Sequence, residues 1–162
     1  MKLPLDPGDY DLEGPFEVRQ GMTMWSIAKL YKDRYPQATM DQLLVGFVRA
    51  NPGAYDGGRV NGVKVGSRLK APSAADVERI PVDDAWALVR INPNADATKA
   101  PSRRALERAR TQMKKQAPGL MARVSARAAE EQKAREARAE EQKAREARAE
   151  AQRKAREEEQ PR

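Results

Sequence analysis

The sequence from residue 102 onward limits where this chain can form a core. The ten-residue segment EEQKAREARA occurs twice in succession, at 130–139 and 140–149, and continues as EAQRKAREEE. These residues favour helix, but none larger than Ala provides an apolar side chain for burial. We therefore expect the folded domain to lie within the first hundred residues.

The net charge of +7 comes entirely from the second part of the chain. Residues 1–100 contain 13 Lys and Arg against 13 Asp and Glu, whereas residues 101–162 contain 18 against 11. Beyond residue 128 the basic side chains alternate with Glu, and no aromatic residue accompanies them. This pattern predicts a solvated spacer rather than a specific nucleic-acid site. The stretch 103–127, with Glu107 as its one acid, is suited to anionic lipid, a polyphosphate backbone or an acidic partner.

Composition argues against catalysis. The chain contains no His and no Cys, so the usual general base near neutral pH and the thiolate ligands of metals are both missing. We expect no enzyme activity, no catalytic residue, no metal site and no cofactor. The sequence contains no run of about 18 apolar residues, so we predict no transmembrane segment within it.

Four short elements are predicted over residues 16–72, after an irregular leader at 1–15. Residues 16–19 alternate apolar with polar, which is typical of a half-buried strand, and 63–72 form a second strand with a bend. Between them, Thr23 is the N-cap of one helix, and Thr39 with Gln42 has the capping-box spacing of another. Apolar residues recur at helical spacing in both: Met24, Ile27, Ala28 and Tyr31, then Met40, Leu43, Leu44, Phe47 and Val48.

Further elements follow this unit. Residues 73–91 predict an additional helix that docks on the domain, with Trp86 packing on the domain or on a partner. Residues 92–101 read as a linker because of their Asn, Pro and polar content. Residues 102–159 predict a charged helical stalk with a break near 117–119, where Pro118 and Gly119 occur.

The predicted fold class is α+β: a small βααβ domain with antiparallel strands and both helices on one face, an extra packed helix, and a long charged α-helical tail. We expect the tail to be a single monomeric helix. A weak coiled coil is the alternative, since Ala residues recur seven apart, although Glu141 and Arg148 would occupy the same seam.

Three segments carry a resemblance to a known family. FEVRQGMTMWSIAKLY, LLVGFVRANPGAY and VNGVKVGSRLKAP resemble the lysin motif (LysM), whose usual runs are V-x-x-G-D-T-L-W-x-I-A, A-N-P and L-x-x-G-x-x-L-x-I-P. The longer end of the second helix and the acidic helix after it look most like the variant in FimV-type proteins, which are polar-hub and type IV pilus assembly factors of Gram-negative bacteria. The resemblance covers 16–72 well and 74–90 loosely, and it implies the same βααβ order.

This resemblance implies a function and a site. LysM modules bind N-acetylglucosamine polymers, peptidoglycan in bacteria, in a shallow groove between two loops. Carried over by position, the glycan-binding residues would be Gly21, Met22, Thr23, Met24, Asn51, Pro52, Gly53 and Ala54. Met22 departs from the family pattern, because it replaces an Asp and so removes a carboxylate from the loop.

Two roles and two locations follow from these patterns. As a non-catalytic peptidoglycan-binding module of a FimV-like cell-envelope protein, the chain would be periplasmic, belong to a longer membrane-attached protein, and meet other envelope or pilus-assembly proteins. Alternatively it is a protein–protein docking module, in a phage baseplate or a cytoplasmic scaffold. The first fifteen residues lack the apolar segment of a signal peptide, which favours the cytoplasm if the chain is complete. Trp25, Tyr31 and Tyr35 are expected to pack in the core.

Overall fold

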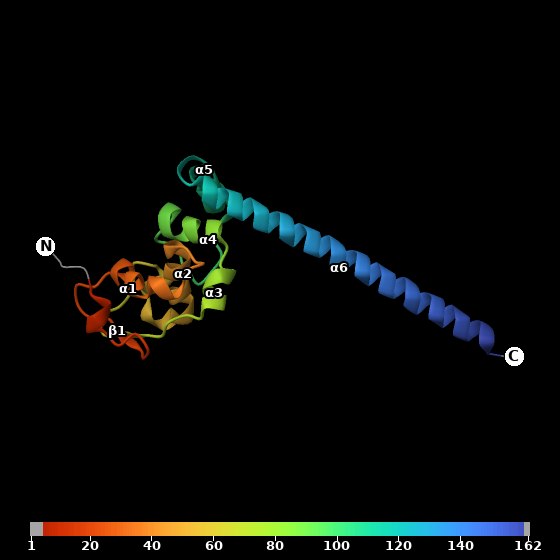
Figure 1. The fold of residues 1–162 in the computed structure, drawn as a ribbon, viewed down its shortest axis with the longest axis horizontal. Coiled ribbons are helices and arrows are strands. Elements are labelled where there is room, and N and C mark those ends of the chain that lie inside the picture. Colours follow the sequence, from red (N-terminus) through yellow and green to blue (C-terminus); the bar gives the residue numbers. More distant parts are fainter. Residues whose placement is uncertain (1–4, 161–162) are drawn as a thin grey trace. The chain divides into compact units, whose positions relative to one another are not determined.

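The computed structural model describes residues 5–160 of the chain (Figure 1). The described part is mostly helical, with one two-stranded antiparallel sheet and a long C-terminal helix. The chain divides into two compact units, Met1–Met121 and Ala122–Arg162, called here the first and second units. Residues 1–4 of the expected leader lie outside the described residues.

The first unit begins with the predicted order of strand, helix, helix and strand. These elements are β1 (Phe16–Glu17), α1 (Met24–Tyr31), α2 (Met40–Ala50) and β2 (Arg68–Leu69). The strands pair antiparallel with Phe16 opposite Leu69. Both are shorter than expected, because beyond Glu17 the pairing runs into a turn. Val18 donates to the Ser67 carbonyl at 2.9 Å and accepts from the Gly66 N–H, where a φ of 86° reverses the chain.

Side-chain caps start both helices where the sequence predicts them. The Thr23 hydroxyl accepts from the Ser26 N–H, and the Thr39 hydroxyl accepts from the Gln42 N–H, with a reciprocal bond in each case. Such a cap satisfies N–H groups that have no partner within the helix. The apolar faces that follow are buried around Tyr31, Phe47 and Leu69, all at 0 % exposure. The predicted helical stripes are therefore confirmed.

The prediction of a single helix over residues 73–91 is wrong. Three helical segments occupy it: α3 (Ala74–Arg79), α4 (Val82–Trp86) and a π-helical turn (Ala87–Ile91). Pro81 causes the first interruption, because it has no N–H and restricts the residue before it. Ile80 accordingly has an extended backbone, with φ −67° and ψ 120°.

Helix α5 (Arg103–Gln116) belongs to the first unit, so the stalk does not begin at residue 102. Its narrow apolar face is buried: Ala105, Ala109 and Met113. Two polar contacts join it to α4, since Arg110 Nε lies 2.9 Å from the buried Asp83 carboxylate and Trp86 Nε1 donates to Gln112 Oε1 at 3.1 Å. Trp86 thus packs on the domain rather than remaining available to a partner.

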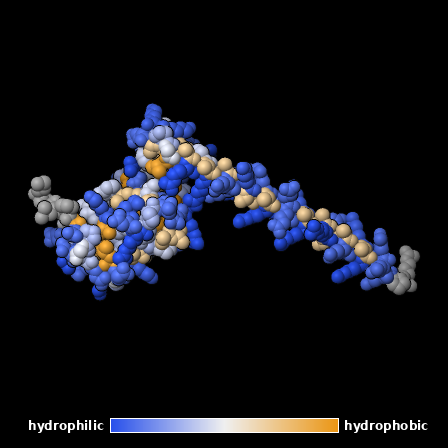
Figure 2. Space-filling view, in the orientation of Figure 1, coloured by the Kyte–Doolittle hydropathy of each residue, from blue (hydrophilic) through white to orange (hydrophobic). Residues whose placement is uncertain are grey.

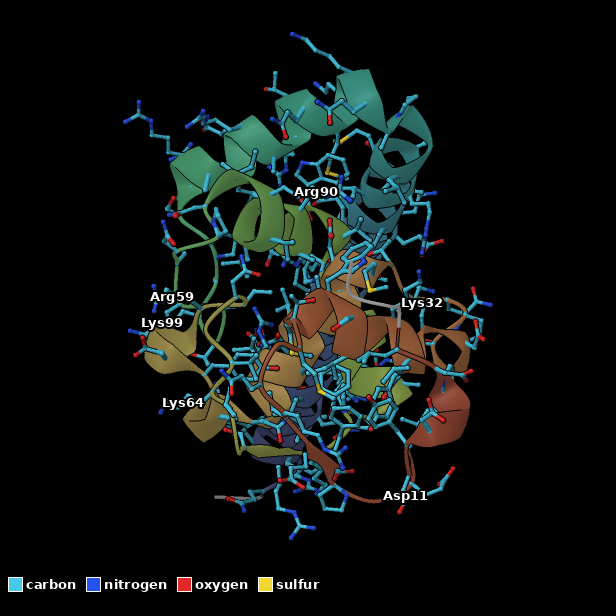
Figure 3. The ribbon with its side chains drawn as sticks, turned by 90° about the vertical axis from the view of Figure 1, so that its left-hand side faces the viewer. Asp11, Lys32, Arg59, Lys64, Arg90 and Lys99 are labelled. Carbon is cyan, nitrogen blue, oxygen red and sulfur yellow. The ribbon has the colours of Figure 1, made fainter. Side chains whose placement is uncertain are left out.

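An ion pair anchors the π-helical turn to α2. Arg90 Nε lies 2.8 Å from Asp41 Oδ2, and its guanidinium stacks over the Trp86 ring at 4.1 Å from the centroid. Figure 3 places Arg90 where this segment meets α5. Burial raises the pKa of Asp41, and the nearby Arg90 lowers that pKa only in part. Arg90 is therefore the main compensation for a buried carboxylate.

The expected linker 92–101 is also docked on the domain. The Ala97 N–H donates to the Gly58 carbonyl at 2.8 Å, and the Ala97 carbonyl accepts from Arg49 Nε at 3.0 Å. Gly58 has a φ of 68°, and a Cβ built on it would lie 2.0 Å from Asp96 Oδ1. Only glycine fits this close approach.

Helix α6 (Pro118–Glu159) starts at the predicted break, since Ala117 leaves the helical conformation. No described residue of it is buried, and Figure 2 shows hydrophilic side chains along its visible face with small apolar ones between them. Ion pairs one turn apart run along α6: Arg127 with Glu131, Glu141 with Arg145, and Glu150 with Lys154. Among the described helices, none has the length and apolar character needed to cross a bilayer.

Gly58→Ala tests the docking of residues 92–101. We expect it to lower the free energy of unfolding by about 3 kcal/mol, because it combines a left-handed backbone with a clash. Gly57→Ala is the matched control: its φ is 61°, but the nearest atom is 3.8 Å away, so strain alone should cost about 1 kcal/mol. Urea unfolding followed by tryptophan fluorescence measures both, and equal losses would contradict the proposed clash.

Arg90→Met tests the anchor between the π-helical turn and α2. Removing the guanidinium should raise the pKa of Asp41 further. A folded pKa above the unfolded one gives a contribution to stability that is present at low pH and lost as pH rises through the folded value. We therefore expect a loss of about 2 kcal/mol at pH 7 and a clearly smaller loss at pH 3.5. Denaturant unfolding at the two pH values measures this, and a pH-independent loss would contradict it.

Candidate functional site

The first predicted loop is a tight turn that leads into α1. Gly21 has a φ of 87°, a left-handed conformation that favours glycine. The Met22 N–H donates to the Arg19 carbonyl at 3.2 Å, and the Met22 sulfur accepts from the Arg19 N–H at 3.4 Å. Met22 is thus folded back over its own turn and half-buried. Thr23 is exposed, with its hydroxyl engaged in the cap of α1.

Met24 joins this loop to the second one. Its side chain is buried, and its sulfur accepts a hydrogen bond of 2.9 Å from the Tyr55 hydroxyl. Burial raises the pKa of Tyr55, so the hydroxyl keeps its proton over the physiological range and remains a donor. Because Tyr55 directly follows Ala54, this bond holds the two predicted loops next to each other.

The second loop is fastened to β2 and to the segment before it. The Asn51 amide pairs with the backbone of Lys70, donating to its carbonyl and accepting from its N–H, both at 2.8 Å. The Asn51 amide also donates to the Phe47 carbonyl at 3.0 Å, so this side chain braces the loop. The Lys64 N–H donates to the Ala54 carbonyl at 2.9 Å, and its ammonium group lies 3.4 Å from the Gly53 carbonyl oxygen.

A few backbone donors remain at this place. The N–H groups of Met24, Trp25 and Gly53 find no acceptor among residues 5–160. Pro52 and Gly53 are exposed, and a Cβ built on Gly53 would meet nothing within 4 Å. A ligand could therefore reach the exposed residues Trp25 and Gly53, whose N–H groups have no acceptor, while the side chains of Met24 and Asn51 are occupied within the protein.

Trp25 is not a core residue, contrary to the expectation. It is 53 % exposed, and Val65, on the segment bonded to β1, is 64 % exposed. Tyr31 and Tyr35 are buried as expected, because they complete the apolar face of α1 and its extension. Trp25 comes one residue after the buried stripe at Met24, so helical geometry turns it away from the core.

The sequence singled out neither Tyr55 nor Lys64, although both hold the second loop. The sequence signal for their roles is weak. Tyr55 and Val63 form a single antiparallel bridge, and the residues between them have the composition of an irregular loop. In Figure 3, Lys64 lies on the side of the first unit away from α5.

The chemistry of this place is that of weak polar recognition. It combines free N–H groups with apolar side chains, and it contains no paired carboxylates or nucleophile–base pair. Within the described residues, no group of three or more His, Cys, Asp or Glu side chains lies together as a metal site would require. Comparison with protein-family models, with curated proteins and with solved structures returns no match to this chain.

Proposed function

We propose that residues 16–72 form a LysM-like, non-catalytic module that binds peptidoglycan. The observation that carries the proposal is the bond between Tyr55 and Met24, which brings residues 21–24 next to residues 51–54. The β1–α1–α2–β2 order, with antiparallel strands, agrees with the order that the resemblance implies.

N-acetylglucosamine suits the groups that this place offers. Its acetamido carbonyl can accept from the free N–H of Trp25 or Gly53, and its methyl group can contact half-buried Met22 and Ala54. The exposed Trp25 ring adds an apolar face next to the first loop. Such a shallow place buries little ligand, so each module binds weakly and a polymer with many repeats is the suitable partner.

The wider role is that of an attachment module in a FimV-like envelope or pilus-assembly protein. In that setting the module acts in the periplasm, as a part of a longer membrane-attached protein, and α6 separates the wall contact from other assembly proteins. At 1.5 Å per residue, its 42 residues extend about 60 Å.

A protein–protein docking module is the second candidate, and one observation favours it. Trp25 and Val65 are large apolar side chains left exposed, and such residues often contact partner proteins. In this role the module would dock in a scaffold without binding glycan, and α6 would remain the spacer.

Gly53→Phe separates the two functions. A phenylalanine at 53 meets open space in the folded protein but covers the Gly53 N–H and its surroundings. We expect about tenfold weaker binding to purified peptidoglycan sacculi in a sedimentation assay, which is about 1.4 kcal/mol. The assay uses about 0.3 M salt, where a Debye length below 8 Å suppresses non-specific attraction by this basic chain.

Gly119→Phe is the matched control, because its Cβ also meets nothing within 4 Å and it adds the same ring. It should bind sacculi like the wild type, and a soluble N-acetylglucosamine tetramer should compete with both. If the wild-type protein stays in the supernatant, peptidoglycan binding is contradicted, and the protein–protein docking module becomes the favoured function.

A further inference from the structure

Four exposed cations of helix α5 lack acidic partners in the described chain, and all of them except Lys114 line the same hollow. Arg104, Arg108 and Lys115 are exposed, and none of them forms a hydrogen bond or ion pair with the side chains of residues 5–160. Arg110, on the same helix, instead pairs with buried Asp83. The three cations therefore do not stabilise α5 against the domain, and their charge is free to attract a ligand.

These cations line one continuous groove. A hollow of about 590 Å³ has Arg104, Arg108 and Lys115 in its wall, and a second of about 440 Å³ shares Ile91 and both arginines with it. Positions 104, 108 and 115 are four and seven residues apart, so they lie on one face of the helix. At 1.5 Å per residue they extend over about 16 Å.

The groove is separate from the candidate glycan site. Figure 3 shows α5 at one end of the first unit, whereas Lys64, which holds the second loop, is labelled well away from it. A ligand in the α5 groove therefore belongs to a second binding function.

A row of cations suits a ligand that repeats its negative charge along a line. Arginine binds phosphate through two N–H groups at once, and about 6 Å of helix separates Arg104 from Arg108. Lys115 continues the row as a point charge about 10 Å further on.

Other anionic partners fit the groove less well. A membrane surface would need apolar side chains to insert, but Ala105, Ala109 and Met113 of α5 are buried, and the half-buried Leu106 lines neither hollow. An acidic protein segment usually also needs large apolar anchors, and Ile91 is the large apolar side chain that the two hollows offer. No aromatic ring lines either hollow, so bases would have nothing to stack on.

We propose that the α5 groove binds a linear chain of phosphates through Arg104, Arg108 and Lys115, without recognising bases. Inorganic polyphosphate and single-stranded nucleic acid share this chemistry. Glu107 also lines the groove, and its carboxylate lies 3.6 Å from the Arg103 guanidinium. Its negative charge repels the phosphates and so lowers the affinity of the groove. A neutral residue at this position would raise that affinity.

Fluorescence anisotropy of full-length protein with fluorescein-labelled dT20 tests the proposal. Three phosphate contacts on a single strand predict an affinity that falls about 20-fold between 50 and 200 mM NaCl. The triple variant R104Q/R108Q/K115Q should bind at least tenfold more weakly at 50 mM NaCl and lose most of the salt dependence. E107Q should bind more tightly than the wild type, which a variant that merely disturbs folding would not do.

The matched control removes the same charge from α6. R138Q/K143Q/R148Q should stay within twofold of wild-type affinity, because these side chains do not line the groove. An equal loss in the control would overturn the proposal, since net charge alone would then explain the binding.

Unlabelled polyphosphate should displace dT20. Displacement by unlabelled dT20 but not by polyphosphate would show that bases contribute, and displacement by poly-glutamate as efficient as by polyphosphate would show an acidic protein partner. Either result would overturn it, as would depletion of the protein by phosphatidylglycerol vesicles without displacement by polyphosphate.

Discussion

The hydrogen bond from the Tyr55 hydroxyl to the Met24 sulfur is the contact on which the candidate site depends. It is buried and joins residues 31 positions apart in the sequence. It therefore fixes the position of residues 21–24 relative to residues 51–54. Asn51 also holds the second loop in place. Its side-chain amide makes both hydrogen bonds to the Lys70 backbone that a neighbouring strand would otherwise make. With these side chains engaged inside the protein, recognition is left to backbone N–H groups and to the rim, where Trp25 is exposed.

A domain as small as residues 16–72 buries little surface, and the rest of the first unit supplies what it lacks. Helices α3 and α4, the π-helical turn and residues 92–101 contact it directly, and α5 packs on α4 and the π-helical turn. The polar links are specific: the buried carboxylates of Asp41 and Asp83 each meet one arginine, Arg90 and Arg110. A buried carboxylate that lost its arginine would be costly, so these pairs favour one docked arrangement of the π-helical turn on α2 and of α5 on α4.

Local signals in the sequence predicted the local structure, and long-range packing was what they missed. Thr23 and Thr39 start their helices because a hydroxyl cap acts within three residues. The interruption at Pro81 was present in the sequence but was outweighed by the helical spacing of Val82, Ala85 and Trp86. The docking of α5 rests on Ala105, Ala109 and Met113, a stripe at i, i+4 and i+8 that six basic residues of the same helix obscured.

The candidate site shows the same division. Its two loops could be placed from the resemblance, but the side-chain roles of Met24 and Asn51 depend on Tyr55 and Lys70, whose proximity no sequence spacing gives. Trp25 differs for another reason: a large aromatic residue next to an apolar stripe was expected in the core, although its position on the helix turns it outward. The cationic groove of α5 likewise depends on long-range contacts, because Arg110 pairs with Asp83 whereas Arg104 and Arg108 line the groove.

The most direct measurement of the central claim is an NMR titration of the nitrogen-15-labelled protein with the N-acetylglucosamine tetramer. If two adjacent loops offer free N–H groups to acetylated sugar, the largest amide shift changes should occur together at Trp25 and Gly53, with α5 unaffected. Shift changes confined to one loop or to α5, or none at millimolar sugar, would contradict the account.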